Sequence, residues 1–190
     1  MIKQLKKLLQ NQKGFTLVEL IVVVVILAIL AAVMIPKLLP YTQQARVSRA
    51  EGDMGTMRSV IEAYCVSNGQ GHYPTTGSPT DGGTGAPTNP TSVTQLGPGA
   101  DIAMVMQTGG VQWTNDSGGI TDPWGDAYVY TPFTDAAGNV IGYSMVSAGP
   151  DKTAGGTDDI FVSSNYSPQQ GSTPANIADG TAGTTEKSNQ

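Results

Sequence analysis

An unbroken apolar run near the N-terminus is the feature that most constrains how this chain folds. All sixteen residues of 20–35 are apolar and read LIVVVVILAILAAVMI. As a helix, the stretch 15–36 has a length of roughly 33 Å, which is enough to cross the hydrocarbon core of a bilayer. The sequence therefore predicts one membrane-spanning helix close to the N-terminus.

The residues before this run differ from an ordinary secretory signal. A signal peptide is cleaved after its apolar stretch, whereas here the processing point, between Gly14 and Phe15, lies before the stretch. Cleavage at that point removes a basic leader with four lysines and leaves the helix as the new N-terminus. Glu19 then lies five residues into the mature chain. An ionisable group inside an apolar span is costly, so Glu19 is predicted to have a function.

The Gly14-Phe15 junction, Glu19 and Pro36 together closely resemble the prepilin signature of type IV pilins and type II secretion pseudopilins. The resemblance implies a prepilin peptidase that cuts after Gly14 and methylates Phe15. It also implies that Glu19 and Pro36 serve filament assembly. The alternative interpretation is an ordinary signal anchor that happens to contain a glutamate.

Charge and cysteine content limit the functions open to the rest of the chain. The formal charge of −5 becomes −9 when the four leader lysines are removed, and an acidic head disfavours nucleic-acid binding. Cys65 is the only cysteine, so the disulfide that closes the C-terminal region of many type IV pilins cannot form. His72 is the only histidine, and neither a CxxC pair nor a nucleophile-elbow motif is present. We therefore expect no catalytic residues and no enzyme activity.

An apolar stripe and a pair of strand-like segments predict the fold. Apolar residues after Pro40 recur at intervals of 3, 4, 3, 4 and 3, which defines one face of a helix; they are Val47, Ala50, Met54, Met57, Ile61 and Tyr64. Residues 128–131 and 140–146 read as an antiparallel hairpin and 160–162 as a third strand, while 102–106 suits a strand or a short helix. The expected fold class is α+β, with a long N-terminal helix packed on a small antiparallel sheet, as in pilins.

Composition shifts along the chain give the expected domain boundaries. They are a leader at 1–14, a membrane-spanning and filament-core helix at 15–39, the second half of the long helix at 40–67, a globular head at 68–165, and a disordered tail at 166–190. Within the head, 69–100 is rich in Gly, Pro, Thr and Ser, so we expect a long surface loop. The tail is polar and poor in apolar residues, which is typical of disorder.

Three carboxylates fall within nine residues of a glycine-bearing loop between two predicted strands. They are Asp151, Asp158 and Asp159, and only Lys152 offsets them. A loop that returns on itself brings like charges together, and a bound cation relieves their repulsion. Oxygen ligands without histidine favour Ca²⁺ over a transition metal. A solvated acidic turn is the alternative.

Three further motifs extend the resemblance to the major pseudopilin of type II secretion. They are HYPTTG after the helix, DPWG before the hairpin and SAGPD…GTDDI after it. This subfamily binds one Ca²⁺ in its last loop, and the matching positions here are the side chains of Asp151, Asp158 and Asp159 with main-chain oxygens of Ala148 and Thr153. The longer loop at 75–120 and the tail after Val162 depart from the pattern.

The resemblance implies a subunit that polymerises into a periplasmic pseudopilus and drives protein export. Its implied partners are further copies of itself, the prepilin peptidase, the inner-membrane secretion platform, minor pseudopilins and the membrane. The leader lysines favour a cytoplasmic leader, while Lys37, Arg46 and Arg49 beyond the span oppose this argument. The resemblance implies anchoring in the inner membrane with the head in the periplasm. A type IV pilin for adhesion, motility or DNA uptake is one alternative. Another, from a different class, is a membrane-anchored enzyme or calcium-dependent binding module that never polymerises.

Overall fold

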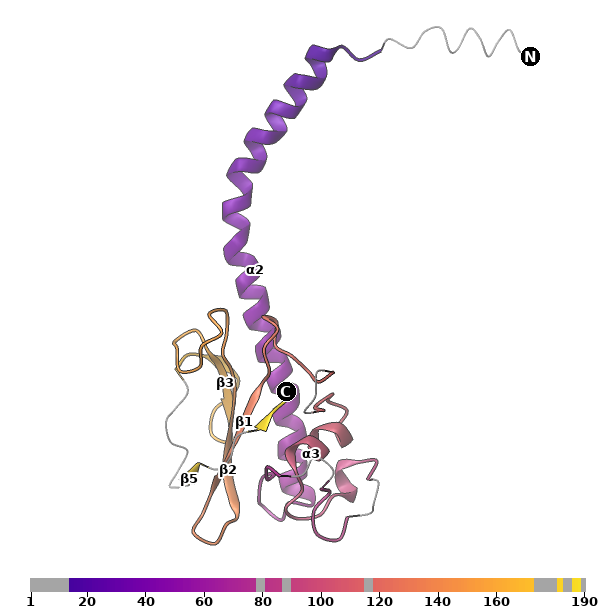
Figure 1. The fold of residues 1–190 in the computed structure, drawn as a ribbon, viewed down its shortest axis with the longest axis vertical. Coiled ribbons are helices and arrows are strands. Elements are labelled where there is room, and N and C mark those ends of the chain that lie inside the picture. The colour runs from indigo at the N-terminus through magenta and orange to yellow at the C-terminus, as the bar shows by residue number, and fades with distance from the viewer. Residues whose placement is uncertain are drawn as a thin grey trace, which may run out of the picture. The chain divides into compact units, whose positions relative to one another are not determined.

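The computed structural model describes residues 14–77, 81–86, 90–114, 118–172, 181–182 and 186–188. These residues form two α-helices, a 3-10 helix and an antiparallel sheet (Figure 1). The chain divides into two compact units, Met1–Thr42 and Gln43–Gln190, and each is described by itself. Most of the predicted leader, 1–13, lies outside the described residues.

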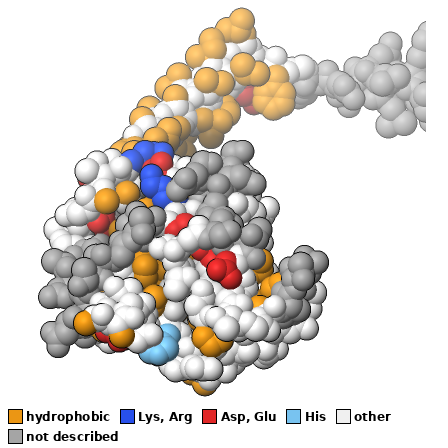
Figure 2. Space-filling model, turned by 60° about the horizontal axis from the view of Figure 1, so that its bottom comes forward, with side chains coloured by type: hydrophobic (Ala, Val, Ile, Leu, Met, Phe, Trp, Pro, Cys, Tyr) orange, Lys and Arg blue, Asp and Glu red, His pale blue; other side chains and the backbone are white. Residues whose placement is uncertain are grey.

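Helix α2 (Leu17–Ser67) carries the apolar run and continues through Pro36 and Pro40 without a break. In the first unit, each of its residues is exposed, including the large apolar side chains of 20–35. Figure 2 shows these apolar side chains gathered on the surface of the N-terminal part of the helix. By length and hydropathy this helix qualifies as a candidate membrane span. An apolar surface of this kind is expected to be covered by lipid or by other protein.

The second half of α2 confirms the predicted stripe. The buried residues on this half are Ala50, Met54, Met57, Ile61, Tyr64 and Cys65. The helix ends where the Asn68-Gly-Gln-Gly turn was expected to stop it. The amide of Gly69 donates to the carbonyl of Tyr64 at 2.8 Å, and Gly71 has a positive φ of 87°, which glycine adopts without steric cost.

The sheet lies in the second unit and is antiparallel throughout. Its strands are β1 (Val129–Thr134), β2 (Val140–Ser147), β3 (Ile160–Ser163), β4 (Gln169–Gln170), β5 (Thr181–Ala182) and β6 (Glu186–Lys187). The order is β4-β3-β2-β1-β5, and β6 also pairs with β1. The predicted hairpin is β1–β2, with Tyr130 opposite Met145, and the predicted third strand is β3. The α+β class is confirmed.

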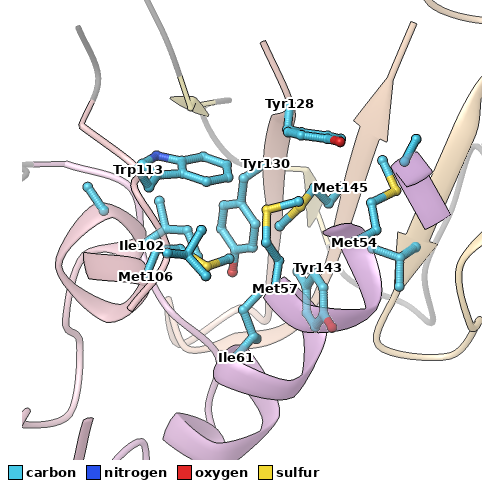
Figure 3. Packing of buried hydrophobic residues seen from close by; sticks show 14 of the residues in the cluster. Met54, Met57, Ile61, Ile102, Met106, Trp113, Tyr128, Tyr130, Tyr143 and Met145 are labelled. Atoms are coloured by element: carbon cyan, nitrogen blue, oxygen red, sulfur yellow. The ribbon is translucent and has the colours of Figure 1, made fainter. Parts of the chain in front are cut away.

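The core forms where the stripe of α2 meets the sheet. Figure 3 shows Met54, Met57 and Ile61 of α2 directed toward Tyr130, Tyr143 and Met145 of the sheet. Trp113, Tyr128, Ile102 and Met106 belong to the same cluster, and all of the side chains named here are fully buried. The unbranched methionines fill the irregular space between a helix and aromatic rings.

The region predicted as a surface loop contributes to a second apolar cluster. Leu96 and Ala100 are buried against Tyr64 and Val105. The Tyr64 hydroxyl donates to the carbonyl of Gly97 at 3.0 Å and accepts from the amide of Ala100 at 3.0 Å. The ambiguous 102–106 stretch is a helix, α3 (Ile102–Thr108), and the 3-10 helix η1 (Val93–Gln95) precedes it. The loop is therefore partly packed on the C-terminal end of α2.

The C-terminal tail is not wholly disordered, so this part of the prediction is wrong. Strands β4, β5 and β6 all fall within 166–190, and β5 and β6 pair with two ends of β1. Residues 173–180, 183–185 and 189–190 lie outside the described residues. The prediction from composition failed because the tail packs on β1 and β3 through backbone pairing and a few polar side chains, and not through an apolar face of its own.

Candidate functional site

The N-terminal end of α2 places the predicted processing residues Gly14 and Phe15 within six positions of the predicted assembly residue Glu19. Gly14, Phe15 and Thr16 precede the helix, and all three are exposed. The Thr16 hydroxyl accepts from the amide of Glu19 at 3.2 Å. Thr16 thus caps the helix, and Glu19 occupies the third helical position of a Thr-x-x-Glu capping pattern.

Glu19 also has a local role that the sequence reasoning did not consider. Its carboxylate lies in the first turn of α2, where negative charge is favourable beside the positive end of the helix dipole. Its side chain is exposed among apolar neighbours, and it takes part in no ion pair of the described chain. Pro36 lies inside α2. The roles of Glu19 and Pro36 in assembly stay predictions.

The DPWG segment forms a turn that Asp122 holds together from inside. Asp122 is 3% exposed, and its Oδ1 accepts from the amides of Trp124 at 3.0 Å and Asp126 at 2.8 Å. Its Oδ2 accepts from the hydroxyl of Ser147 at 2.6 Å. Since Ser147 is the last residue of β2, this carboxylate fixes the turn to the strand that leads into the acidic loop.

Two further contacts tie the DPWG turn to its surroundings. The indole Nε1 of Trp124 donates to the side-chain oxygen of Gln43 on α2 at 3.2 Å. Asp126 Oδ2 lies 3.2 Å from Nζ of Lys152, which belongs to the acidic loop. The turn is therefore linked to both the helix and the loop. Sequence reasoning cited DPWG only as a resemblance motif and missed the buried role of Asp122.

The acidic loop leaves β2 at Ser147 and enters β3 at Ile160. Gly149 has a φ of 67°, and a Cβ there would overlap the carbonyl oxygen of Asp158, so only glycine lets the two ends of the loop approach this closely. The Ser147 hydroxyl also accepts from the amide of Gly149 at 3.3 Å. The ends of the loop are thus fixed by contacts that continue from Asp122.

Asp159 is the carboxylate at the centre of this loop. It is fully buried, and its Oδ2 accepts from the amide of Gly155 at 2.7 Å. Its Oδ1 is buried without a hydrogen-bond partner in the described part of the chain. Burial raises the pKa of Asp159, and the negative charges of Asp158 and Asp151 raise it further. A buried carboxylate oxygen without a partner is unfavourable unless water or a cation satisfies it.

The structure brings the three predicted carboxylates together unequally. A Cβ built on Gly156 would lie 2.5 Å from Asp158 Oδ1 and 3.7 Å from Asp159 Oδ1, so both oxygens face the same glycine. Asp151 is exposed and its Oδ1 accepts from the amide of Thr153 at 2.8 Å. Within the described ranges, no group of three or more acidic, histidine or cysteine side chains is arranged to hold a metal ion.

The loop therefore fits a calcium ion in part. Its carboxylate oxygens and the orphan oxygen of Asp159 suit Ca²⁺, but in the described part of the chain the three carboxylates do not form a group arranged to hold a metal ion. The predicted role of the main-chain oxygens of Ala148 and Thr153 as calcium ligands stays untested. The calcium site stays a prediction.

Comparison with known proteins gives the class of this protein first. Residues 9–35 match the family described as the prokaryotic N-terminal methylation motif. Together with the long N-terminal helix packed on an antiparallel sheet, this match defines a prepilin-like protein. No solved structure matches the chain.

Relatives over most of the chain give the particular family. The type II secretion system core protein G of Escherichia coli is 31% identical over 150 residues, which cover 79% of this chain and 90% of that protein. The protein of the same name in Pseudomonas aeruginosa is 32% identical over 78% of this chain and 91% of its own length. This chain belongs to the type II secretion system core protein G family.

A third relative matches a smaller share of the chain. The type IV major fimbrial protein FimA of Dichelobacter nodosus is 49% identical over 59 residues, which cover 31% of this chain and 37% of that protein. This match covers less than a third of this chain, whereas the matches to core protein G cover about four fifths.

Proposed function

We propose that this chain is the major pseudopilin of a type II secretion system. Many copies polymerise into a periplasmic pseudopilus, and growth of this filament at the inner membrane drives protein export. Similarity to core protein G over about four fifths of the chain is the observation that carries this proposal.

The exposed apolar surface of α2 gives the physical reason for assembly. The side chains of 20–35 are about half exposed, as Val22 and Leu30 illustrate at 50% and 54%. A single copy satisfies this surface only in a bilayer. When copies leave the membrane for a filament, the same surfaces cover one another. Its partners are accordingly the membrane, the prepilin peptidase, the secretion platform, minor pseudopilins and other copies of this chain. The head lies in the periplasm.

Glu19 supplies register to this assembly. In a filament core its carboxylate is surrounded by apolar side chains, where an unpaired charge costs several kcal/mol. The N-terminal amine of Phe15 on an adjacent copy is the complementary group, available after cleavage behind Gly14. Packing that pairs the two charges is favoured over packing that does not, so Glu19 selects the axial offset between neighbours.

Calcium fastens the acidic loop in place of a disulfide. The side chains of Asp151, Asp158 and Asp159 hold the ion, together with main-chain oxygens of Ala148 and Thr153. The orphan oxygen of Asp159 supports this assignment, since a hard cation satisfies it. The ion supplies electrostatic cross-linking only, and no catalytic step is assigned to it.

Deletion and complementation test the proposed function. Deleting the gene should leave exported proteins in the periplasm, and supplying the chain in trans should restore their release. A matched variant, Glu19→Ala, should be produced and cleaved but fail to restore release. Normal export in the deletion strain, with loss of surface filaments or of surface motility, would identify a type IV pilin instead.

A further inference from the structure

The last described residues form a strap across the outer edge of β1. Strand β6 pairs Glu186 with Tyr130 and Lys187 with Val129. Beyond it, the Ser188 amide donates to the carbonyl of Tyr128 at 2.9 Å, and the Tyr128 amide donates to the Ser188 hydroxyl at 2.9 Å. Ser188 is fully buried. These contacts give the strap a defined register on β1.

Gly119 shows that the strap has a prepared place in the head. A Cβ on Gly119 would overlap the carbonyl oxygen of Ser188. The Ser188 hydroxyl donates to the neighbouring carbonyl of Ile120 at 2.7 Å. Any side chain larger than that of glycine at 119 therefore excludes the strap from this position.

The strap directs one charged side chain, Glu186, into the head. Glu186 is 7% exposed, and its Oε1 accepts from the indole Nε1 of Trp113 at 3.1 Å. Its carboxyl group lies close enough to that of Asp101, which is 1% exposed, for the two to interact and for Glu186 to raise the pKa of Asp101. Two carboxyl groups within hydrogen-bond distance are attracted only when a proton lies between them, because two carboxylates repel.

Asp101 is held in place by its own segment. Its Oδ1 accepts from the amide of Ala103 at 2.8 Å and caps α3, and its Oδ2 accepts from the amide of Gly77 at 2.7 Å. The side chain therefore cannot turn away from Glu186 without uncapping the helix. The pair is fixed by α3 on one side and by the strap on the other.

The surroundings favour a proton on the pair. Burial raises the pKa of Asp101 to about 7, with a further contribution from the charge of Glu186, against the opposing effect of the two backbone amides. Among the described residues, the indole of Trp113 and the phenol of Tyr130 face the pair, and both are neutral at physiological pH. Lys187, the next residue of the strap, is exposed.

We propose that Asp101 and Glu186 form a proton-sharing latch that docks the C-terminal strap on β1 in mildly acidic conditions and releases it as the pH rises. The docked strap binds one proton that the free strap does not. When this proton leaves, two buried carboxylates face each other, and the strap departs from the edge of β1. The latch does not depend on the proposed role in secretion.

The direction follows from proton linkage. An isolated aspartate titrates near pH 4, whereas Asp101 beside the docked strap titrates at about 7. Docking is therefore strongest below about pH 4, weakens between about 4 and 7, and is constant above that range. Within this window, uptake of one proton changes the docking equilibrium by up to about tenfold per pH unit.

Hydrogen exchange on the full chain in detergent micelles tests the latch. Peptides containing Tyr128 and Ser188 report docking directly, because these two amides donate across the strap. Their protection factors, which divide out the intrinsic exchange rate at each pH, should fall by up to about a hundredfold between pH 5 and pH 7. Equal protection at both pH values overturns the proposal.

Two variants and one control separate the latch from a general effect of pH. Glu186→Gln keeps an acceptor for Trp113 and donates to Asp101, so its protection should be the same at pH 5 and pH 7. Lys187→Gln alters the charge of the neighbouring exposed residue and should retain the wild-type fall. Gly119→Ala should lose protection at both pH values. Persistence of the fall in Glu186→Gln, or full protection in Gly119→Ala, contradicts the proposal.

Discussion

Replacing Asp122 with alanine gives the most direct measure of what holds the head together beside the acidic loop. The buried carboxylate accepts three hydrogen bonds, from the amides of Trp124 and Asp126 and from the hydroxyl of Ser147. Asp122→Ala removes all three acceptors at once. It also separates the DPWG turn from the end of β2.

The three lost hydrogen bonds do not cost the same free energy of unfolding. Trp124 and Asp126 are partly exposed, so water reaches their amides, and we assign about 1 kcal/mol to each. Ser147 is fully buried, and its hydroxyl loses a short bond to a charged group, which adds about 2 kcal/mol. The expected loss is about 4 kcal/mol, or a melting temperature lower by about 10 °C in a domain of this size.

Thermal unfolding followed by near-ultraviolet circular dichroism measures this loss, because the buried aromatic core of the head provides the signal. Asp122→Asn should lie between alanine and wild type, since its oxygen still accepts from both amides. Asp135→Ala is the matched control. That carboxylate also accepts three hydrogen bonds, from the amide of Ala137 and from the amide and side chain of Asn139, but in an exposed turn.

Asp135→Ala should lower the melting temperature clearly less than Asp122→Ala does, because water replaces the hydrogen bonds of the exposed Asp135 carboxylate. If Asp122→Ala melts within about 3 °C of wild type, the buried carboxylate is not what joins the turn to β2. If the two alanine variants shift equally, burial does not set the cost of these bonds.

Three further outcomes test the processing, assembly and calcium assignments. Gly14→Leu should leave the leader attached because a bulky side chain does not fit the peptidase, and mass spectrometry should find the intact chain where wild type begins at Phe15. Glu19→Ala should be cleaved normally yet give few filaments in electron micrographs, whereas normal filament yield would remove the role in register. Wild type should melt at a higher temperature in Ca²⁺ than in EGTA, by up to about 2.7 kcal/mol of stabilisation at a hundredfold excess over Kd. Asp158→Ala should lose that difference, and equal melting of wild type in both solutions would identify a solvated turn.

Periodicity predicted the elements that bury a continuous apolar face. The spacing from Val47 to Tyr64 indicated a helix with one buried side, and the structure buries that side. Alternation and a glycine-bearing turn indicated the hairpin β1–β2 in the same way. Five apolar residues at 102–106 were too few to choose between a helix and a strand. The N-cap Asp101 directly before them was the signal that favours a helix.

Contacts between distant polar residues were beyond the sequence patterns. Glu186 stands in a polar tail, and its burial depends on Asp101 and Trp113, which lie more than seventy positions earlier. Leu96 lies in a Gly- and Pro-rich stretch, and its burial follows from the Tyr64 hydroxyl that holds the neighbouring backbone. The assignments at Gly14 to Glu19 and at 151–159 stay predictions, and the sequence reasoning missed Asp122, the buried carboxylate that joins the DPWG turn to the end of β2.

The cap at Thr16 has a consequence for how a protease reaches the predicted cleavage point. The Thr16 hydroxyl accepts from the amide of Glu19 and caps the N-terminus of α2, which begins at Leu17. The predicted cleavage point, the peptide bond between Gly14 and Phe15, therefore lies outside the helix. A peptide bond inside a helix has its amide and carbonyl engaged and its backbone enclosed by side chains, whereas a bond before the cap is open. A protease that binds extended backbone is stopped at the first helical turn and leaves the membrane segment intact.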